Sequence, residues 1–229
     1  MAKSTKHIAV MMAAAVLMLA QCELARAAVI ANWGFELVTP PTVEVTAGQA
    51  SQGPFAPDEG SGAASGVHAA PARWSTPNGN GSPTSWNSTV WAAGDYYQFE
   101  VSTAGLEDIT IAWDQTRSSN GPATWDLQYA TSTAGPFTTF VDDYVVPQAT
   151  WDATLANSTT KFFADLGAIS SLDDGTAVFR LVAQTAGVNT GGQSRVDNII
   201  VSGTPVPEPT TVLGLVFVSL TRRRLRRRA

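Results

Sequence analysis

Short segments in which hydrophobic and polar residues alternate recur through the central part of the chain. In the first of them, Tyr97, Phe99 and Val101 fall on one face, with polar residues between them. Alternation with a period of two is typical of strands buried on one side, and no long helical pattern separates the segments. They are Asp95–Ser102, Asp108–Arg117, Thr124–Ser132, Thr176–Thr185 and Ser194–Gly203. The pattern predicts an all-β protein.

Glycine–proline pairs punctuate the chain at Gly53-Pro54, Gly121-Pro122 and Gly135-Pro136. Such pairs mark turns. Many short strands joined by turns indicate an antiparallel, jelly-roll-like β-sandwich over residues 28–205, with a β-barrel as the alternative. Residues 44–90 show little periodicity and are rich in Gly, Ala, Ser and Pro in their first half. They are either a mobile insertion or strands that the pattern does not reveal.

The first 27 residues have the pattern of a secretory signal peptide. Lys3 and Lys6 precede the apolar run 8–20, and Ala25 and Ala27 frame a small-x-small cleavage site. We therefore expect the export machinery and signal peptidase to act on this chain. The sole cysteine, which lies in this segment at position 22, offers the alternative of a lipoprotein acylation site. Either route leaves the remaining domain without a disulfide.

The C-terminal end carries a Pro-Glu-Pro motif, a short apolar run and an arginine cluster, in that order. The residues are Val206, Pro207, Glu208 and Pro209, then the run 210–220, then Arg222, Arg223, Arg224, Arg226, Arg227 and Arg228. This order resembles the PEP-CTERM sorting signal of exported bacterial proteins, also catalogued as an ice-binding-protein C-terminal domain. The resemblance implies recognition by an exosortase, a membrane protease-transpeptidase that removes the tail and releases or attaches the protein at the cell surface.

The apolar run 210–220 is short for a transmembrane segment. Its eleven residues would form about 16 Å of helix, against a hydrocarbon core of about 30 Å. The alternative to a sorting signal is a basic amphipathic tail that touches anionic lipid. With the signal peptide, residues 206–229 predict a location in the envelope or outside the cell, with a transient or permanent C-terminal anchor.

Between these ends, the domain 28–205 is strongly acidic. It contains seventeen Asp and Glu against five Lys and Arg, a formal charge of −12. Such a domain repels nucleic acid and anionic membrane. Because of this repulsion, we expect no nucleic-acid partner. The negative charge is compatible with divalent cations and with neutral sugars.

The domain opens on Asn32-Trp33-Gly34-Phe35-Glu36 and closes on Asp197-Asn198-Ile199-Ile200-Val201. This frame resembles the galactose-binding-like sandwiches and related carbohydrate-binding modules. The resemblance implies that the two terminal strands lie close together and hold a structural calcium, with Glu36 and Asp197 at the matching positions. The alternative is that Glu36 is a solvated edge residue and that Asp197 caps a turn or pairs with an arginine.

Tryptophan suggests a second kind of site. Trp74, Trp86 and Trp91 lie in a polar stretch with asparagines nearby, and an exposed indole beside amides can stack on a sugar ring. These three are the candidate ligand-binding residues. The alternative is that they anchor an irregular loop onto the sandwich. Trp113 and Trp125 share faces with Ile and Leu and are predicted to be core residues.

Signals for catalysis are weak. The domain has one histidine, His68, so a Ser-His-Asp relay is formally possible, but no Gly-x-Ser-x-Gly motif accompanies it. No phosphate-binding or dinucleotide motif occurs. We therefore expect an exported, non-enzymatic binding or structural module in the envelope or exopolysaccharide. The alternatives are a carbohydrate-binding module for exopolysaccharide and a secreted glycosidase that uses two carboxylates.

Overall fold

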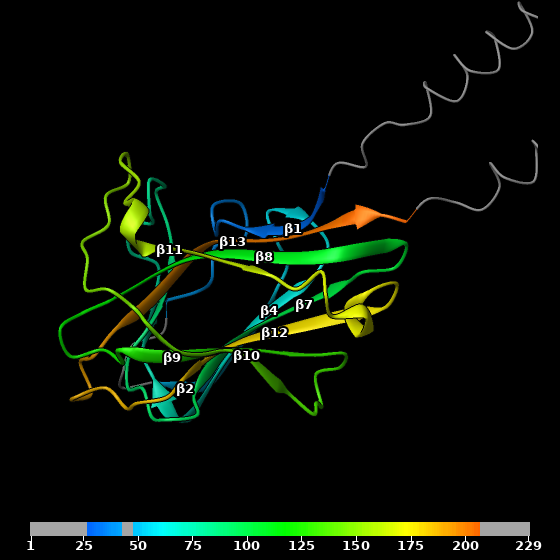
Figure 1. Cartoon of the computed structure of the whole chain (residues 1–229). Coiled ribbons are helices and arrows are strands. Elements are labelled where there is room, and N and C mark those ends of the chain that lie inside the picture. Colours follow the sequence, from blue (N-terminus) through cyan, green and yellow to red (C-terminus); the bar gives the residue numbers. More distant parts are fainter. Residues whose placement is uncertain (1–26, 43–47, 207–229) are drawn as a thin grey trace, which may run out of the picture.

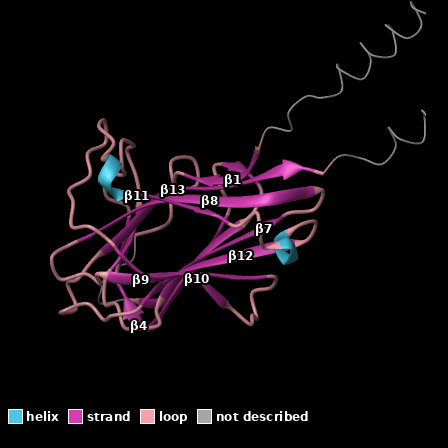
Figure 2. Cartoon of the chain, viewed as in Figure 1, coloured by secondary structure: helices cyan, strands magenta, loops and turns pink. Residues whose placement is uncertain are grey.

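The computed structural model describes residues 27–42 and 48–206, and these form two antiparallel β-sheets packed face to face (Figure 1, Figure 2). Sheet A contains β1 (Ala28–Trp33), β3 (Glu59–Gly60), β5 (Trp74–Ser75), β6 (Trp86–Ser88), β8 (Leu106–Arg117), β11 (Lys161–Asp165) and β13 (Ser194–Pro205). Sheet B contains β2 (Gln49–Phe55), β4 (Ala63–Ala72), β7 (Tyr96–Ser102), β9 (Thr124–Ala130), β10 (Thr138–Val145) and β12 (Thr176–Ala183). The predicted all-β sandwich is confirmed.

The strand order shows that the first and last strands of the domain are neighbours in sheet A. Sheet A runs β11-β8-β13-β1-β3, with β6 also paired to β13 and β5 paired to β6, and sheet B runs β10-β9-β12-β7-β4-β2. From β7 onward the chain passes repeatedly from one sheet to the other. β1 pairs with β13 in a register that places Ala28 opposite Gly203 and Trp33 opposite Ile199. The first and last strands therefore lie side by side, as the carbohydrate-binding resemblance implies.

Alternation along the chain predicts the buried face of the central strands correctly. Tyr97, Phe99 and Val101 of β7 are buried, and so are Trp113 of β8 and Trp125 of β9. Each lies on the face of its strand that meets the opposite sheet, because successive side chains of a strand point to opposite faces. The polar residues between them remain on the outer faces.

Residues 48–90, which lack periodicity, form strands β2 to β6. Small and large inward residues lie on different strands here: a Cβ added to Gly66 of β4 would collide with the Trp74 ring and lie 3.0 Å from Cη2 of Trp86. These two large partners belong to the very short strands β5 and β6, so they do not alternate along β4 itself. Hydrophobic periodicity therefore cannot reveal these strands.

The turn predicted at Gly53-Pro54 is wrong. Both residues lie inside β2, where the register shifts between Gln52 and Phe55. β2 is an edge strand of sheet B, and an edge strand accommodates proline at a bulge. The other two glycine–proline pairs lie in the loops after β8 and β9, as predicted.

The three tryptophans proposed as a sugar platform are interior residues, so that prediction is wrong. Trp74, Trp86 and Trp91 are 0%, 0% and 3% exposed. The rings of Trp74 and Trp86 stack with centroids 5.2 Å apart, and the Trp91 ring meets Trp125 edge-on at 4.8 Å. The indoles fill one end of the space between the sheets, because burying an aromatic ring stabilises more than exposing it. The alternative reading, in which they anchor their segment onto the sandwich, agrees with the structure.

Most of the predicted signal peptide and sorting tail lies outside the described residues. Within the described part, no helix is long and apolar enough to cross a membrane. Every described strand, and the core between the sheets, lies between Ala28 and Pro205.

Gly66→Ala tests the packing of β4 against the indoles. The added methyl group collides with the Trp74 ring, and overpacking of this kind destabilises by about 1–3 kcal/mol. Urea unfolding of residues 28–206 measures the effect. Gly175→Ala is the control, because the nearest atom to its Cβ is 3.6 Å away. Equal stability of the two variants would contradict the packing described.

Candidate functional site

Asp197 and Glu36, the predicted calcium pair, both contact the loop Gly79–Thr84. Asp197 Oδ2 accepts hydrogen bonds from Asn80 N at 2.7 Å and Ser82 Oγ at 2.8 Å. Glu36 Oε1 accepts one from Thr84 N at 2.9 Å. The two residues that the resemblance pairs therefore contact the same loop, although each accepts hydrogen bonds from different atoms of it.

A second buried carboxylate, Asp114 of β8, lies beside Asp197. Its Oδ2 accepts from Asn80 Nδ2 at 2.8 Å and from Asn198 Nδ2 at 2.9 Å. Burial raises the pKa of Asp197 to about 7, and the charge of Asp114 contributes in the same direction. Burial likewise raises the pKa of Asp114. The two carboxyl groups form a buried acidic pair cross-linked by amides.

The groups that face these carboxylates are mostly N–H donors, whereas calcium binds oxygen ligands. In this arrangement Glu36 and Asp197 do not fit a shared calcium ion. They act as acceptors that fix the loop, which agrees with the alternative in which Asp197 caps a turn. The calcium site itself remains a prediction.

Three other carboxylates converge on the β9–β10 hairpin. Oxygens of Asp126, Asp142 and Asp143 lie within 4.8 Å of one another, and Asp126 Oδ1 accepts a hydrogen bond from Asp143 N at 2.9 Å. Asp142 and Asp143 are exposed. Adjacent acids at an exposed hairpin are ordinarily solvated.

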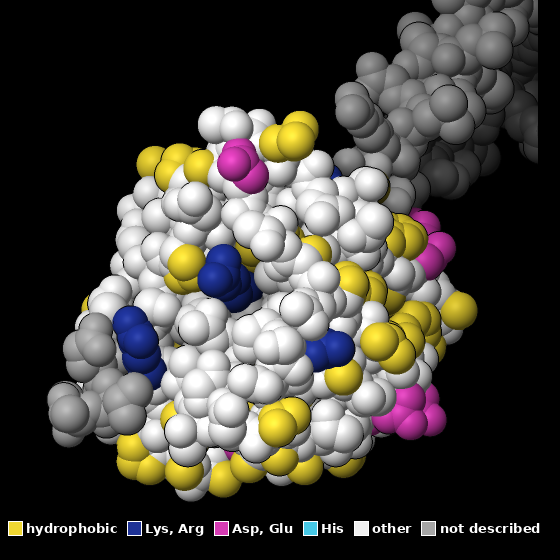
Figure 3. Space-filling view, turned by 90° about the vertical axis from the view of Figure 1, so that its left-hand side faces the viewer, with side chains coloured by type: hydrophobic (Ala, Val, Ile, Leu, Met, Phe, Trp, Pro, Cys, Tyr) yellow, Lys and Arg dark blue, Asp and Glu magenta, His cyan; other side chains and the backbone are white. Residues whose placement is uncertain are grey.

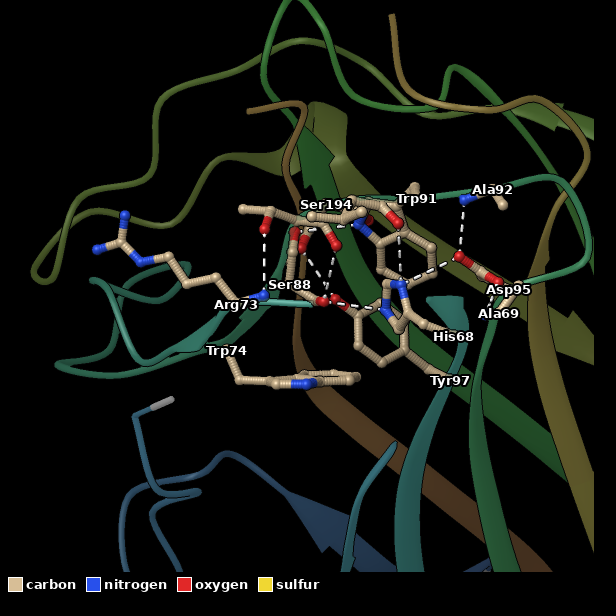
Figure 4. Close-up of polar contacts among 12 residues, drawn as sticks. His68, Ala69, Arg73, Trp74, Ser88, Trp91, Ala92, Asp95, Tyr97 and Ser194 are labelled. Atoms are coloured by element: carbon tan, nitrogen blue, oxygen red, sulfur yellow. Dashed lines mark hydrogen bonds and ion pairs between the residues drawn. The ribbon is translucent and has the colours of Figure 1, made fainter. Parts of the chain in front are cut away.

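Ser88, His68 and Asp95 have the connectivity of a Ser-His-Asp relay (Figure 4). Ser88 Oγ lies 2.9 Å from His68 Nε2, and His68 Nδ1 lies 3.0 Å from Asp95 Oδ2. Asp95 also accepts hydrogen bonds from Ala69 N at 2.7 Å and Ala92 N at 2.6 Å. The relay joins β4, β6 and the segment before β7. It is the arrangement that the single histidine made formally possible.

The relay is sealed inside the sandwich. Ser88, His68 and Asp95 are 0%, 4% and 3% exposed. The His68 ring packs against the rings of Trp74 and Trp91, with centroids 4.9 Å and 4.2 Å away. A nucleophile must reach the reacting carbon of its substrate. Ser88 Oγ is buried and has no such access in this structure. The relay is therefore a buried hydrogen-bond network that links β4, β6 and the segment before β7.

An open site lies at the end of the sandwich where β13 begins. Two adjoining hollows there have volumes of about 360 and 370 Å³, and both are lined by Gln193 and Arg195. We call the two together the end hollow. One part adds Thr116, Arg117, Ser118, Ser119, Gln148, Ala149 and Thr150, and the other adds Thr42, Arg73, Ser75, Thr76, Pro77 and Asn87. The lining is almost entirely polar.

The floor of the end hollow is a row of outward-facing residues across sheet A. Arg195 of β13 pairs in register with Asn87 of β6 and Thr116 of β8, and Asn87 pairs with Ser75 of β5. Asn87 Nδ2 donates to Ser75 Oγ at 2.9 Å. Asn87 is only 2% exposed, and its Oδ1 has no hydrogen-bond partner in the described residues. A buried acceptor without a donor costs about 1–3 kcal/mol.

Three arginines, Arg73, Arg117 and Arg195, lie around this row. Arg117 Nε donates to Val146 O at 3.0 Å, and Nη1 donates to the carbonyls of Ser118 and Ser119. Arg195 Nη2 lies 3.5 Å from Gln193 Oε1, and burial lowers the pKa of Arg195 from its usual value. Within the described residues, neither Arg117 nor Arg195 forms an ion pair with a carboxylate. Arg73 extends away from the buried relay in Figure 4 and lines the second part of the hollow.

Sequence reasoning missed this site. Arg73, Arg117 and Arg195 are far apart in the chain, and only the register of β13 with β6 and β8 reveals that they share one end of the sandwich. The one available signal is the scarcity of basic residues in the domain.

Known proteins give limited guidance. No family model matches this sequence, and no curated protein matches it. Among solved structures, the CBM22-1–GH10 modules of Clostridium thermocellum endo-1,4-β-D-xylanase 10B, solved with xylohexaose, are 12% identical with a TM-score of 0.43, over 80% of this chain and 30% of that one. A structure of carbohydrate-binding modules from the β-sandwich superfamily is 13% identical with a TM-score of 0.42, over 75% of this chain and 61% of that one.

The K1 cleaved adhesin domain of Lys-gingipain from Porphyromonas gingivalis is also similar. It is 9% identical with a TM-score of 0.39, over 58% of this chain and 83% of that one. Similarity of this size reaches no further than the β-sandwich fold.

Asp95→Asn tests the buried relay. Burial opposes ionisation of Asp95, but hydrogen bonds from His68, Ala92 and Ala69 lower its pKa below the ordinary value of 3.8. A lowered pKa means that the ionised group stabilises the fold above about pH 4, and that this contribution is lost as the pH falls through the folded-state pKa. The variant should therefore be less stable by about 1–3 kcal/mol at pH 7, and the difference should shrink below pH 4.

Urea unfolding at pH 7, 4 and 3 measures this difference, with Glu59→Gln as a surface control. A difference that is constant with pH would show that Asp95 does not stabilise the fold through its charge.

Proposed function

We propose that this chain is an exported, non-catalytic surface or matrix protein whose β-sandwich binds polysaccharide in the end hollow. One observation carries the proposal: the Asn87 side chain lines an open polar hollow, and its buried amide oxygen has no hydrogen-bond partner among the described residues. A ligand hydroxyl that donates to this oxygen would satisfy it.

The lining of the hollow suits a saccharide. Sugar hydroxyls donate and accept hydrogen bonds, and the hollow offers the Asn87 acceptor, the guanidinium donors of Arg195 and Arg117, and the amide of Gln193. Because Trp74, Trp86 and Trp91 are interior, the proposed site has no indole platform from these residues. Binding therefore depends on hydrogen bonds, which favours recognition of hydroxyl orientation over simple stacking.

No catalytic step belongs to the proposal. Ser88 of the relay and the acidic pair of Asp114 and Asp197 are buried in the sandwich, whereas the end hollow is lined by arginines, amides and hydroxyls. The roles proposed for this domain are binding and attachment.

The C-terminal segment supplies the second half of the proposal, namely sorting by an exosortase. The order of the Pro207-Glu208-Pro209 motif, the apolar run and the arginine cluster supports it. The cationic end resists translocation and keeps that end on the cytoplasmic side, so the sandwich is held outside.

A reporter fusion tests the sorting proposal. Residues 206–229 are fused to an exported reporter in a bacterium that has an exosortase, and a second fusion carries Gln at all six arginines from Arg222 to Arg228. Loss of the charges removes the barrier to translocation. The first fusion should be processed and retained in the envelope, whereas the second should be secreted unprocessed. Identical processing of both would overturn the proposal.

Asn87→Leu tests polysaccharide binding. Isothermal titration and affinity electrophoresis of residues 28–206 on a panel of neutral and acidic polysaccharides should give binding that the variant weakens about tenfold, the worth of one hydrogen bond. Asn32→Leu is the matched control, because Asn32 Oδ1 is also buried without a partner but lies outside the hollow. Each titration is repeated with millimolar calcium, which also examines the predicted ion.

Two results would contradict the proposal. One is the absence of binding across the whole panel, and the other is equal affinity of the Asn87 variant and the unmodified domain.

A further inference from the structure

The basic residues of the domain are concentrated at the end hollow. The domain contains five Lys and Arg among seventeen acids, and three of the five, Arg73, Arg117 and Arg195, line the hollow. Figure 3 shows basic side chains across this end of the molecule, with acidic ones toward its margins. A domain of formal charge −12 thus keeps most of its positive charge at one concave site.

Arg195 occupies the centre of that site, since both parts of the hollow include it. A guanidinium has five N–H donors and stays charged in proteins. Within the described residues, the side chain of Arg195 donates to a neutral amide oxygen, Gln193 Oε1, 3.5 Å away. The hydroxyl group of Thr116, its neighbour in register on β8, donates to the carbonyls of Pro147 and Ala149 and accepts from Ala149 N.

In the described part of the chain, Arg195 is a partly desolvated cation without a counter-charge. Such an arrangement is unfavourable, and an anion placed beside the guanidinium compensates for it. Planar, bidentate recognition of oxyanions is the interaction that arginine makes best. Arg117 donates to three carbonyl oxygens, so it adds positive potential to the hollow while remaining fixed in place. The adjacent Asn87 Oδ1 has no donor among the described residues, and a ligand hydroxyl group would supply one. A ligand that binds both Arg195 and Asn87 therefore carries an acidic group and a hydroxyl group near each other.

We infer that the end hollow selects polysaccharides that carry an anionic substituent on the sugar, a carboxylate or a sulfate ester, and that Arg195 binds this substituent. This inference rests on the proposed polysaccharide binding and adds its ligand class. Sugar hydroxyls adjacent to the substituent donate to Asn87. The acidity of the rest of the domain disfavours densely charged polyanions such as nucleic acid, so the hollow favours anionic groups spaced along an otherwise uncharged chain.

Paired polysaccharides test the inference in residues 28–206, a segment without the arginine-rich tail. The carboxylate arm compares a polygalacturonate that is mostly methyl-esterified, and so carries widely spaced carboxylates, with the complete methyl ester, which removes the remaining charge and keeps the chain. The sulfate arm compares a sulfated galactan with the same galactan after desulfation. Affinity for at least one charged member should exceed that for its uncharged counterpart about tenfold, as expected for a charge-assisted pair of hydrogen bonds.

Arg195→Gln should abolish that difference, so that the variant binds the charged and the uncharged member of each pair with equal affinity. Arg180→Gln is the matched control: this guanidinium lies between the rings of Tyr96 and Phe137, at 4.0 Å and 3.6 Å from their centroids, outside the hollow. Thermal unfolding confirms that both variants fold. Preserved preference for the charged polymer in Arg195→Gln, or equal loss in Arg180→Gln, would overturn the inference.

Different results would overturn the proposed polysaccharide binding and the inferred anionic ligand class. Binding to neutral polysaccharides that depends on Asn87 but shows no preference for either charged member leaves the proposed function standing and overturns the anionic ligand class. No binding to any polysaccharide overturns both. A preference in the carboxylate arm alone, or in the sulfate arm alone, supports the inference and identifies the substituent.

Discussion

Packing of Trp74 and Trp86 against Gly66 is the interaction on which this end of the molecule depends. The two indoles stack between the sheets and occupy the space that a side chain on Gly66 would fill. Their N–H groups are satisfied by Gln49 O and Gln52 Oε1, at 2.9 Å in both cases. Through these contacts the short strands β5 and β6, which belong to sheet A, are also held to sheet B.

Three consecutive residues of β6 then serve three purposes. Trp86 points into the core, Asn87 lies on the opposite face at the floor of the end hollow, and Ser88 points inward to His68. This follows from the two-residue period of a strand, which assigns neighbours to opposite faces. A shift of β6 by one residue would turn the indole to the outer face of the sheet and the amide toward the core. The hollow and the relay therefore depend on the same register as the core.

The sequence is informative where one strand carries its own pattern, as in β7 and β8, whose alternating Tyr, Phe, Val and Ile residues predict both the strand and its buried face. It is uninformative where large and small residues are complementary across sheets: Gly66 and Trp86 pack together, but neither shows a period of its own. The end hollow could not be predicted from the sequence for a related reason. Arg195 and Asn87 become neighbours only through strand pairing, and the polarity around Trp86 suggested exposure although the ring is buried.

The direction of β13 has a consequence for a protein held at its C-terminal end. This strand begins beside the end hollow at Ser194 and runs to Pro205, next to Ala28 of β1; the two ends of the domain leave together at the far side of the sandwich (Figure 1). Ten residues separate Arg195 from Pro205, and at about 3.3 Å per residue this is about 33 Å. With the proposed attachment of the tail to the envelope, this separation would place the hollow on the side of the sandwich that faces away from the cell.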